Sequence, residues 1–225
     1  MNTGTIARRS SSSWMLTTTG IQGHSSQIFK DKLGYGAIFE ATRIVNAFRE
    51  ELVGEEYLSF NPGTIVGGTD VNYDPVTSRG TTFGKTNVVS QATTVHGGIR
   101  TISTEQLDKA MARMEDIASQ NLPGTTAKIK FRTSYPPMAP TKQNYALLDK
   151  LESVNVDLGY GKLEPLDPGK RGAADISFVA PHVDASLAGM GPDGFGEHSE
   201  KEGLDLTSLP KTTTRAAILI YRLTR

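Results

Sequence analysis

The order of helical and β-type patterns over residues 14–133 is the feature that most constrains how this chain can fold. From residue 37 to residue 52, apolar side chains recur every three or four positions, which predicts an amphipathic helix. A second amphipathic helix is predicted behind Ser103 and Gln106, whose spacing is that of a capping box. Two helices of this kind each need a sheet or another helix to cover their apolar face.

Strand-like segments flank and separate the two helices. They lie at residues 14–19, at residues 57–69 with an interruption at a proline, at residues 87–100, and at residues 127–131. A polar segment over residues 70–84 is predicted to be a long loop. The resulting order is β-α-β-β-α-β, so the sequence predicts a ferredoxin-like α+β sandwich with both helices on one face of an antiparallel sheet.

A proline-rich segment at residues 135–140 is predicted to end this sandwich, because proline fixes φ and lacks a backbone donor. We therefore expect a domain over residues 14–134, a lead-in segment or linker over residues 1–13, and a second part over residues 135–225. The second part has only about 90 residues, which is small for a self-sufficient α/β domain. Its predicted helices lie at residues 142–152 and 209–223.

Composition excludes several classes of function. Lysine plus arginine and aspartate plus glutamate are equal at 24 each, so no net field favours nucleic acid or an anionic membrane. No apolar run reaches the roughly 20 residues that span a bilayer, and no signal-peptide pattern is present; the compartment stays unknown. The chain has no cysteine, no nucleophile-elbow motif and no phosphate-binding loop motif, which leaves metal chemistry as the best-supported class.

His198 is the first candidate metal ligand. It follows a glycine-rich turn and is flanked by carboxylates, including Glu202. Neutral imidazole is a common zinc ligand, but a catalytic zinc site needs about three protein ligands. The sequence offers no obvious partners for it, because His182 with Asp184 lies between a proline and a run of small residues and is predicted not to bind metal.

Two further histidines are open to a structural explanation. His24 follows the first predicted strand and has serine neighbours, so it can protrude from the sheet edge, although a surface turn explains the same pattern. His96 lies within a predicted strand and is expected to be structural. The single tryptophan, Trp14, is expected to anchor the core.

Several short motifs together resemble a known family in their order and spacing. They are the segment from Gly20 to Ser26, Gly67-Gly68-Thr69, Asn87-Val88-Val89, Gly98-Ile99-Arg100, and the segment from Gly194 to Ser199 followed by Glu202. The pattern resembles the co-catalytic zinc exopeptidases and deacylases, which include glutamate carboxypeptidase, aminoacylase, carnosinase and succinyl-diaminopimelate desuccinylase. It is most similar to the glutamate carboxypeptidase type, over nearly the whole chain.

This resemblance implies a zinc-binding α/β domain into which a βαββαβ dimerisation domain, or lid, is inserted. Residues 1–13 would then be the end of the preceding catalytic-domain segment or a linker, residues 14–134 the lid, and residues 135–225 the C-terminal part of the catalytic domain. It implies that His198 is a zinc ligand and that His24 reaches into the active site of a partner subunit to stabilise an oxyanion. Asn87 and Arg100 are implied to hold the carboxylate of a peptide or N-acyl amino acid substrate. The implied cofactor is zinc, two ions per intact site, and the implied partner is a second copy of the chain or an intact relative.

One departure from the family pattern is an absence. The family's first metal-binding motif, bridging aspartate, glutamate general base and next carboxylate ligand lie upstream of the lid, and this sequence has no counterpart to them. We therefore expect the C-terminal portion of a zinc-dependent exopeptidase or deacylase that is inactive by itself. The alternatives are a non-catalytic dimerisation module and, third, a structural remnant without a selected role that tends to aggregate.

Overall fold

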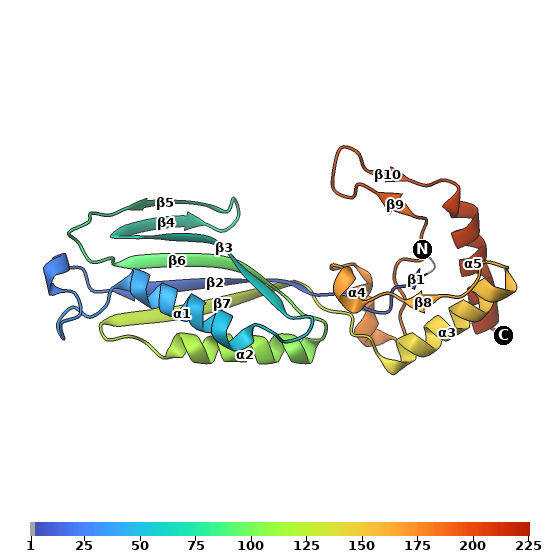
Figure 1. The fold of residues 1–225 in the computed structure, drawn as a ribbon, viewed down its shortest axis with the longest axis horizontal. Helices are drawn as coiled ribbons and strands as arrows, with labels where there is room; N and C mark the ends of the chain where they lie inside the picture. Colours follow the sequence, from blue (N-terminus) through green and yellow to red (C-terminus); the bar gives the residue numbers. More distant parts are fainter. Residues whose placement is uncertain (1–2) are drawn as a thin grey trace. The chain divides into compact units, whose positions relative to one another are not determined.

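The computed structural model describes residues 3–225, which divide into two compact units (Figure 1). The sandwich unit comprises residues 10–136, and the terminal unit joins the N-terminal segment up to Arg9 to residues 137–225. Strand β2 begins at Ser11, so residues 11–13 lie in the sheet of the sandwich unit.

The sandwich unit has a four-stranded antiparallel sheet in the order β3-β6-β2-β7. Helices α1 and α2 lie on one face of this sheet (Figure 1). The βαββαβ arrangement predicted from the apolar periodicity is therefore confirmed. The elements are β2 (Ser11–Gly20), α1 (Ala37–Leu52), β3 (Ser59–Gly68), β6 (Ala92–Arg100), α2 (Thr104–Ser119) and β7 (Thr125–Tyr135).

Trp14 is at the centre of the core between the sheet and the helices. It is 1% exposed, and its ring meets the ring of Phe48 edge-on at 5.7 Å between centroids. The indole Nε1 donates a hydrogen bond of 3.1 Å to the Gly98 carbonyl, so its polar atom is satisfied. The capping box is also present, because the Ser103 hydroxyl accepts a 3.1 Å hydrogen bond from the Gln106 backbone N–H.

The segment predicted as a long loop, residues 70–84, instead contains a β-hairpin. Strands β4 (Asp70–Asp74) and β5 (Arg79–Phe83) pair antiparallel. Asp74 shapes the turn, because its carboxylate accepts hydrogen bonds from the Val76 N–H at 2.9 Å and the Thr77 hydroxyl at 2.6 Å. The prediction was wrong because it overlooked the short alternation in β4, where Val71 and Tyr73 are half-buried, and because β5 is exposed throughout and shows no alternation.

Tyr73 of β4 attaches this hairpin to the sheet. Its hydroxyl lies 2.8 Å from Nδ1 of His96 on β6 and accepts a hydrogen bond of 3.1 Å from the Thr64 hydroxyl on β3. The ring of His96 is therefore engaged by a neighbouring element within the sandwich unit. Strand β3 is interrupted as predicted, with a register shift between Pro62 and Thr64.

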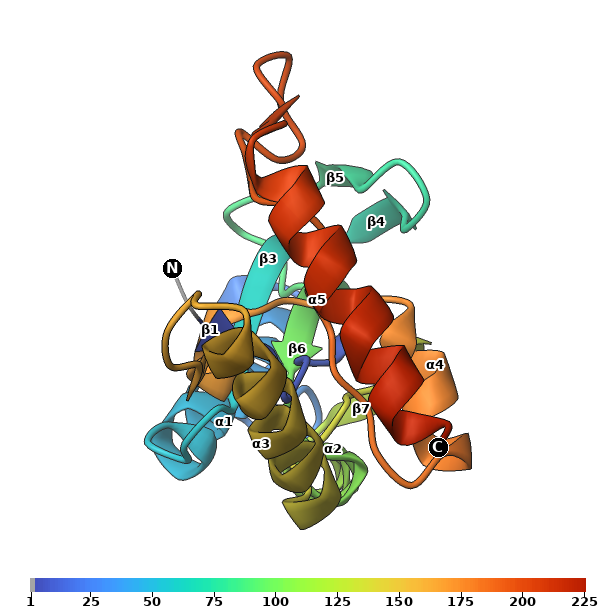
Figure 2. The same ribbon diagram turned by 90° about the vertical axis from the view of Figure 1, so that its right-hand side faces the viewer.

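The terminal unit is mostly helical. Helices α3 and α5 lie side by side (Figure 2), and Arg222 donates a hydrogen bond of 2.6 Å to Asp157 between them. The helices are α3 (Lys142–Asp157), α4 (Ile176–Val179) and α5 (Ser208–Leu223). The strands form two short pairs, β1 (Thr3–Gly4) with β8 (Glu164–Pro165) and β9 (Gly194–Phe195) with β10 (Gly203–Leu204). Three short 3-10 helices complete the described elements, at Ser25–Gln27 in the sandwich unit and at Pro168–Lys170 and Ala180–His182 in the terminal unit.

Across residues 3–225, no helix combines the length and apolar character needed to cross a bilayer.

Candidate functional site

Two loops meet at one end of the sheet in the sandwich unit and bring His24 and Asn87 together. The Ser25 N–H donates to the Asn87 carbonyl at 2.9 Å, and the Val89 N–H donates to the Gly23 carbonyl at 2.9 Å. His24 is paired with Val88 in an isolated antiparallel bridge. The side chains of His24 and Asn87 are both exposed, so they are available to a ligand.

This loop pairing also changes the predicted strand at residues 87–100. Strand β6 begins only at Ala92, and Asn87 lies in a turn before it. Backbone hydrogen bonds from the loop that contains His24 hold this turn in place. The side chain of Val89, two residues after Asn87, is buried and also fixes the position of the turn. The substrate-binding position predicted at Asn87 is therefore a loop position next to His24.

The imidazole of His24 has a defined orientation. Its Nδ1 accepts a hydrogen bond of 3.2 Å from the Ser26 backbone N–H and lies 2.8 Å from the Ser26 hydroxyl oxygen. Because a backbone N–H can only donate, Nδ1 is an acceptor, and the neutral ring carries its proton on Nε2. Ser26 thus orients the donor atom of His24. Sequence reasoning gave Ser26 no role, and the only signal for one was a hydroxyl residue two positions after the histidine.

A cavity of about 540 Å³ lies beside His24, within the range of small-molecule pockets. Its lining includes the polar side chains of Gln22, Gln27, Lys30 and Asp31 together with the apolar side chains of Ile21 and Leu33. Lys30 donates a hydrogen bond of 3.0 Å to the Gln27 side chain. The exposed histidine, the cavity and Asn87 form a polar region on one end of the sheet.

Arg100 is at the opposite end of β6. The strand runs from Ala92 to Arg100, and at about 3.3 Å per residue this corresponds to roughly 26 Å. Near Arg100, the Ser10 N–H donates to the Thr101 carbonyl at 2.8 Å, which fixes the chain where it enters the sheet. The structure therefore groups His24 with Asn87 and separates both from Arg100 of the same chain.

His198 lies in the terminal unit, in the turn between β9 and β10. Its φ is 64°, a left-handed conformation, and its backbone N–H donates to a Glu202 carboxylate oxygen at 3.1 Å. The imidazole is exposed. Within residues 3–225, no three or more His, Asp or Glu side chains are grouped closely enough to hold a metal ion. The residues present therefore do not form a complete zinc site around His198.

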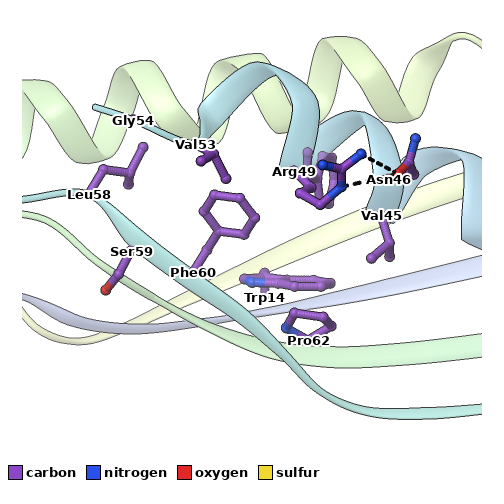
Figure 3. Close-up of a pocket in the computed structure, with 11 residues that line it drawn as sticks. Trp14, Val45, Asn46, Arg49, Val53, Gly54, Leu58, Ser59, Phe60 and Pro62 are labelled. Atoms are coloured by element: carbon purple, nitrogen blue, oxygen red, sulfur yellow. Dashed lines mark hydrogen bonds between the residues drawn. The ribbon is translucent and has the colours of Figure 1, made fainter. Parts of the chain in front are cut away.

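An apolar groove of about 520 Å³ lies between α1 and β3 of the sandwich unit (Figure 3). Its floor and walls include Trp14, Phe60 and Pro62, and Val53 and Arg49 of the α1 region lie opposite. Arg49 donates hydrogen bonds of 3.3 Å and 3.1 Å to the Asn46 side chain at its rim. No local sequence pattern indicates this groove, because its walls come from segments that are separate in the chain.

The sheet, its two helices and the paired loops define the sandwich unit as a lid-type α+β domain. In agreement with this, the family described as the peptidase dimerisation domain matches residues 6–126, which is more than half of the chain. The chain therefore belongs to the M20 peptidase family and carries its dimerisation domain. A comparison with curated proteins finds no match.

Solved structures share the fold. The chain is similar to aminopeptidase PepT from Bacillus cereus, with 16% identity and a TM-score of 0.72 over 100% of this chain and 54% of that one. A tripeptidase from Staphylococcus aureus gives 19% identity and a TM-score of 0.68 over 97% and 53%. A dinuclear metal-binding M20 peptidase from Bacillus subtilis gives 18% identity and a TM-score of 0.62 over 97% and 51%. The chain thus spans about half the length of these structures.

Proposed function

We propose that this chain carries the dimerisation domain and the C-terminal catalytic portion of a zinc-dependent exopeptidase or deacylase. Its substrate would be a peptide or N-acyl amino acid with a free carboxylate, as in the glutamate carboxypeptidase type. The observation that carries the proposal is the fixed pairing of His24 and Asn87 within a peptidase dimerisation domain. The terminal unit, which includes His198, is assigned to the catalytic portion.

His24 is proposed to stabilise the oxyanion that develops when the amide carbonyl is attacked. Its Nε2–H is suited to this role, since Ser26 occupies Nδ1 and leaves Nε2 as the donor. A donor oriented in advance is worth more than one that must reorganise during the reaction. The neighbouring amide of Asn87 is proposed to hold the substrate carboxylate.

Arg100 is also proposed to bind a substrate carboxylate, but in a different active site from His24 and Asn87. The roughly 26 Å length of β6 prevents the three side chains of one chain from contacting the same small substrate. In a dimer, one end of the lid would serve the partner's site and the other end its own site. The guanidinium of Arg100 suits a planar carboxylate whichever of the two active sites it serves.

His198 is proposed to be one zinc ligand. The remaining ligands would come from a segment outside residues 3–225, since no group of three candidate side chains occurs within them. Zinc would supply Lewis-acid chemistry in the complete site. Glu202 helps to hold the turn that presents His198, through the hydrogen bond to its backbone N–H.

The first test is to dialyse the purified chain against zinc and measure bound metal and hydrolysis of acyl-glutamate and dipeptide substrates. We expect turnover only when a polypeptide carrying the upstream ligands is added. In that reconstituted form, His24→Ala should lower kcat by about 10²–10³ with unchanged metal content. Stoichiometric zinc with turnover by the chain alone would contradict its incompleteness, and a parallel loss of metal and activity in His24→Ala would contradict the oxyanion role.

Self-association is proposed to use the groove and the outer edge of β3. Strand β3 has no charged residue, and Ile65 on it is 56% exposed. The opposite edge strand, β7, instead exposes Lys128, Lys130 and Arg132, and lysines on an edge prevent pairing with another sheet. The uncharged edge with its apolar groove therefore suits a second copy of this chain.

A pair of lysine substitutions tests this interface. Ile65→Lys should convert the dimer to a monomer in analytical ultracentrifugation, because it places a charge on the apolar edge. Thr126→Lys adds the same charge to the β7 edge and should leave the dimer intact. A dimer that survives Ile65→Lys, or that is lost equally in both variants, would exclude the β3 edge.

A non-catalytic dimerisation module is the second candidate function. It is favoured by the absence of a three-ligand cluster among the described residues. Such a module would dimerise after treatment with a chelator and would show no turnover even with the upstream polypeptide present. Reconstituted turnover would exclude it.

A further inference from the structure

A small polar cavity of about 70 Å³ lies in the terminal unit, outside the segment that matches the dimerisation domain. Helix α5 contributes Ser208, Lys211, Thr212 and Arg215 to its wall. These residues are spaced by three and four positions, so they share one face of the helix. None of the residues assigned above to catalysis or substrate binding contributes to it.

Arg215 is the central feature of this cavity. Its side chain is largely inaccessible, with the residue only 7% exposed, and its buried Nε has no hydrogen-bond partner among the described residues. Burial lowers the pKa of the Arg215 guanidinium from its ordinary value, and nearby Asp193 opposes this shift. An arginine stays charged under such conditions, so the structure contains a buried cation with an unused donor.

The charge around Arg215 is not balanced. Arg171, Lys211 and Arg215 line the cavity together with one carboxylate, Asp193. No carboxylate of the described residues lies within the 4.0 Å ion-pair distance of Arg215. Lys211 is held with its Nζ 5.0 Å from the centroid of the Tyr160 ring. The cavity is therefore electropositive, and an anion would lower its energy.

The shape of the cavity limits the size of that anion. Gly189 has a φ of +67°, and a Cβ at this position would lie 3.1 Å from the Thr5 hydroxyl oxygen. Gly189 and Gly191 therefore line the cavity without side chains. A volume of about 70 Å³ holds several water molecules, at roughly 10–15 Å³ each by the same kind of measure, or one small oxyanion.

We propose that this cavity binds a small tetrahedral oxyanion of the inorganic phosphate type, with Arg215 as its central donor and Arg171 and Lys211 as further cations. Thr5 also lines the cavity and can add a neutral hydrogen-bonding group. The guanidinium supplies paired N–H donors, which match two oxygens of a phosphate. A water molecule could accept a hydrogen bond from Nε of Arg215, but it would leave the excess positive charge of the cavity uncompensated.

The test is a calorimetric titration of the full chain with inorganic phosphate, at ionic strength held constant with KCl. We expect saturable binding in the wild type and at least a tenfold weaker dissociation constant in Arg215→Met. Arg222→Met is the matched control, because Arg222 is on the same helix but is bonded to Asp157 at 2.6 Å, and its replacement should leave binding unchanged. Arg171→Met should also weaken binding, and it serves if Arg215→Met does not fold by circular dichroism.

Three results would overturn the proposal. One is a flat phosphate titration of the folded wild-type chain. Another is equal weakening in Arg215→Met and Arg222→Met, which would mean that only the overall charge matters. The third is acetate binding as tightly as phosphate, since this would assign the cavity to carboxylates. Neither positive nor negative results here depend on peptidase activity, so they are separate from the test of the proposed function.

Discussion

The two units of this chain bury apolar surface to very different extents. In the sandwich unit, thirteen buried side chains from the sheet and both helices form one cluster, with Trp14 and Phe48 at its centre. In the terminal unit, the corresponding cluster has six buried side chains, among them Leu151 and Leu219. Apolar burial is the main stabilising term in folding. We therefore expect the sandwich unit to have the larger free energy of unfolding.

Exposed apolar side chains show the same contrast. Several large ones of the terminal unit are about half exposed or more, including Phe178, Phe195 and Ile220. In the larger sandwich unit they are fewer and scattered, from the loop after β2 through α1 and β3 to the β4–β5 hairpin. This comparison indicates that a two-layer sheet and helix sandwich completes its own core, whereas the terminal unit leaves apolar surface for another element to cover.

The largest expected effect tests the core of the sandwich unit. Phe48→Ala should lower its free energy of unfolding by about 3–5 kcal/mol, because the buried ring leaves a cavity against Trp14. Denaturant titration followed by fluorescence measures this, since Trp14 is the only tryptophan. Phe39→Ala, at a position 50% exposed, is the control and should cost much less. Similar losses in both would mean that the cluster does not determine stability.

The next effect concerns the core of the terminal unit. Leu151→Ala should cost about 2–3 kcal/mol in that unit, because Leu151 is 1% exposed but belongs to a smaller cluster that can relax. Hydrogen exchange of the α3 and α5 amides should increase, while the Trp14 fluorescence midpoint stays constant. A midpoint that shifts as much as it does for Phe48→Ala would show that the two units unfold together.

The N-caps of α2 and α3 allow the two units to be compared through a smaller change in stability. Ser103 caps α2 and Thr141 caps α3, with acceptor distances of 3.1 Å to the third residue's N–H in both cases. Replacing either by alanine should cost about 1 kcal/mol in its own unit, because one terminal backbone donor is left without its partner. Fluorescence should detect only Ser103→Ala, and hydrogen exchange should locate Thr141→Ala in α3. The reverse pattern would contradict separate units.

The smallest effect is the acid sensitivity of the β4–β5 hairpin. Hydrogen bonds from the Thr77 hydroxyl and the Val76 N–H lower the pKa of Asp74. A lowered native pKa gives stabilisation that is present above the unfolded pKa of about 3.9 and is lost as the pH falls through the native value. Exchange of the Val76 amide should therefore rise below about pH 4 in excess of its intrinsic change. Asp74→Asn should abolish that excess, and Asp70→Asn should retain it.

Much of the fold could be predicted because its signals are local. The spacing of apolar residues from Ala37 to Leu52, the capping box at Ser103 and the alternation in β7 each depend on neighbours within a few positions. The hairpin at residues 70–83 was missed because β5 is exposed throughout and leaves no pattern, and because the alternation in β4 extends over only five residues. The resemblance to a peptidase family supplied the candidate residues, and their roles remain proposals.

By itself, the sequence determined the helices, most strands and their βαββαβ order, since local periodicity and caps set each element. Only the tertiary structure decided that Asn87 lies beside His24 while Arg100 is at the far end of β6, because strand pairing and loop contacts set those positions. It also decided that Arg215 is buried with an unused donor. Contacts between segments distant in the chain depend on how elements pack, and no local pattern encodes them.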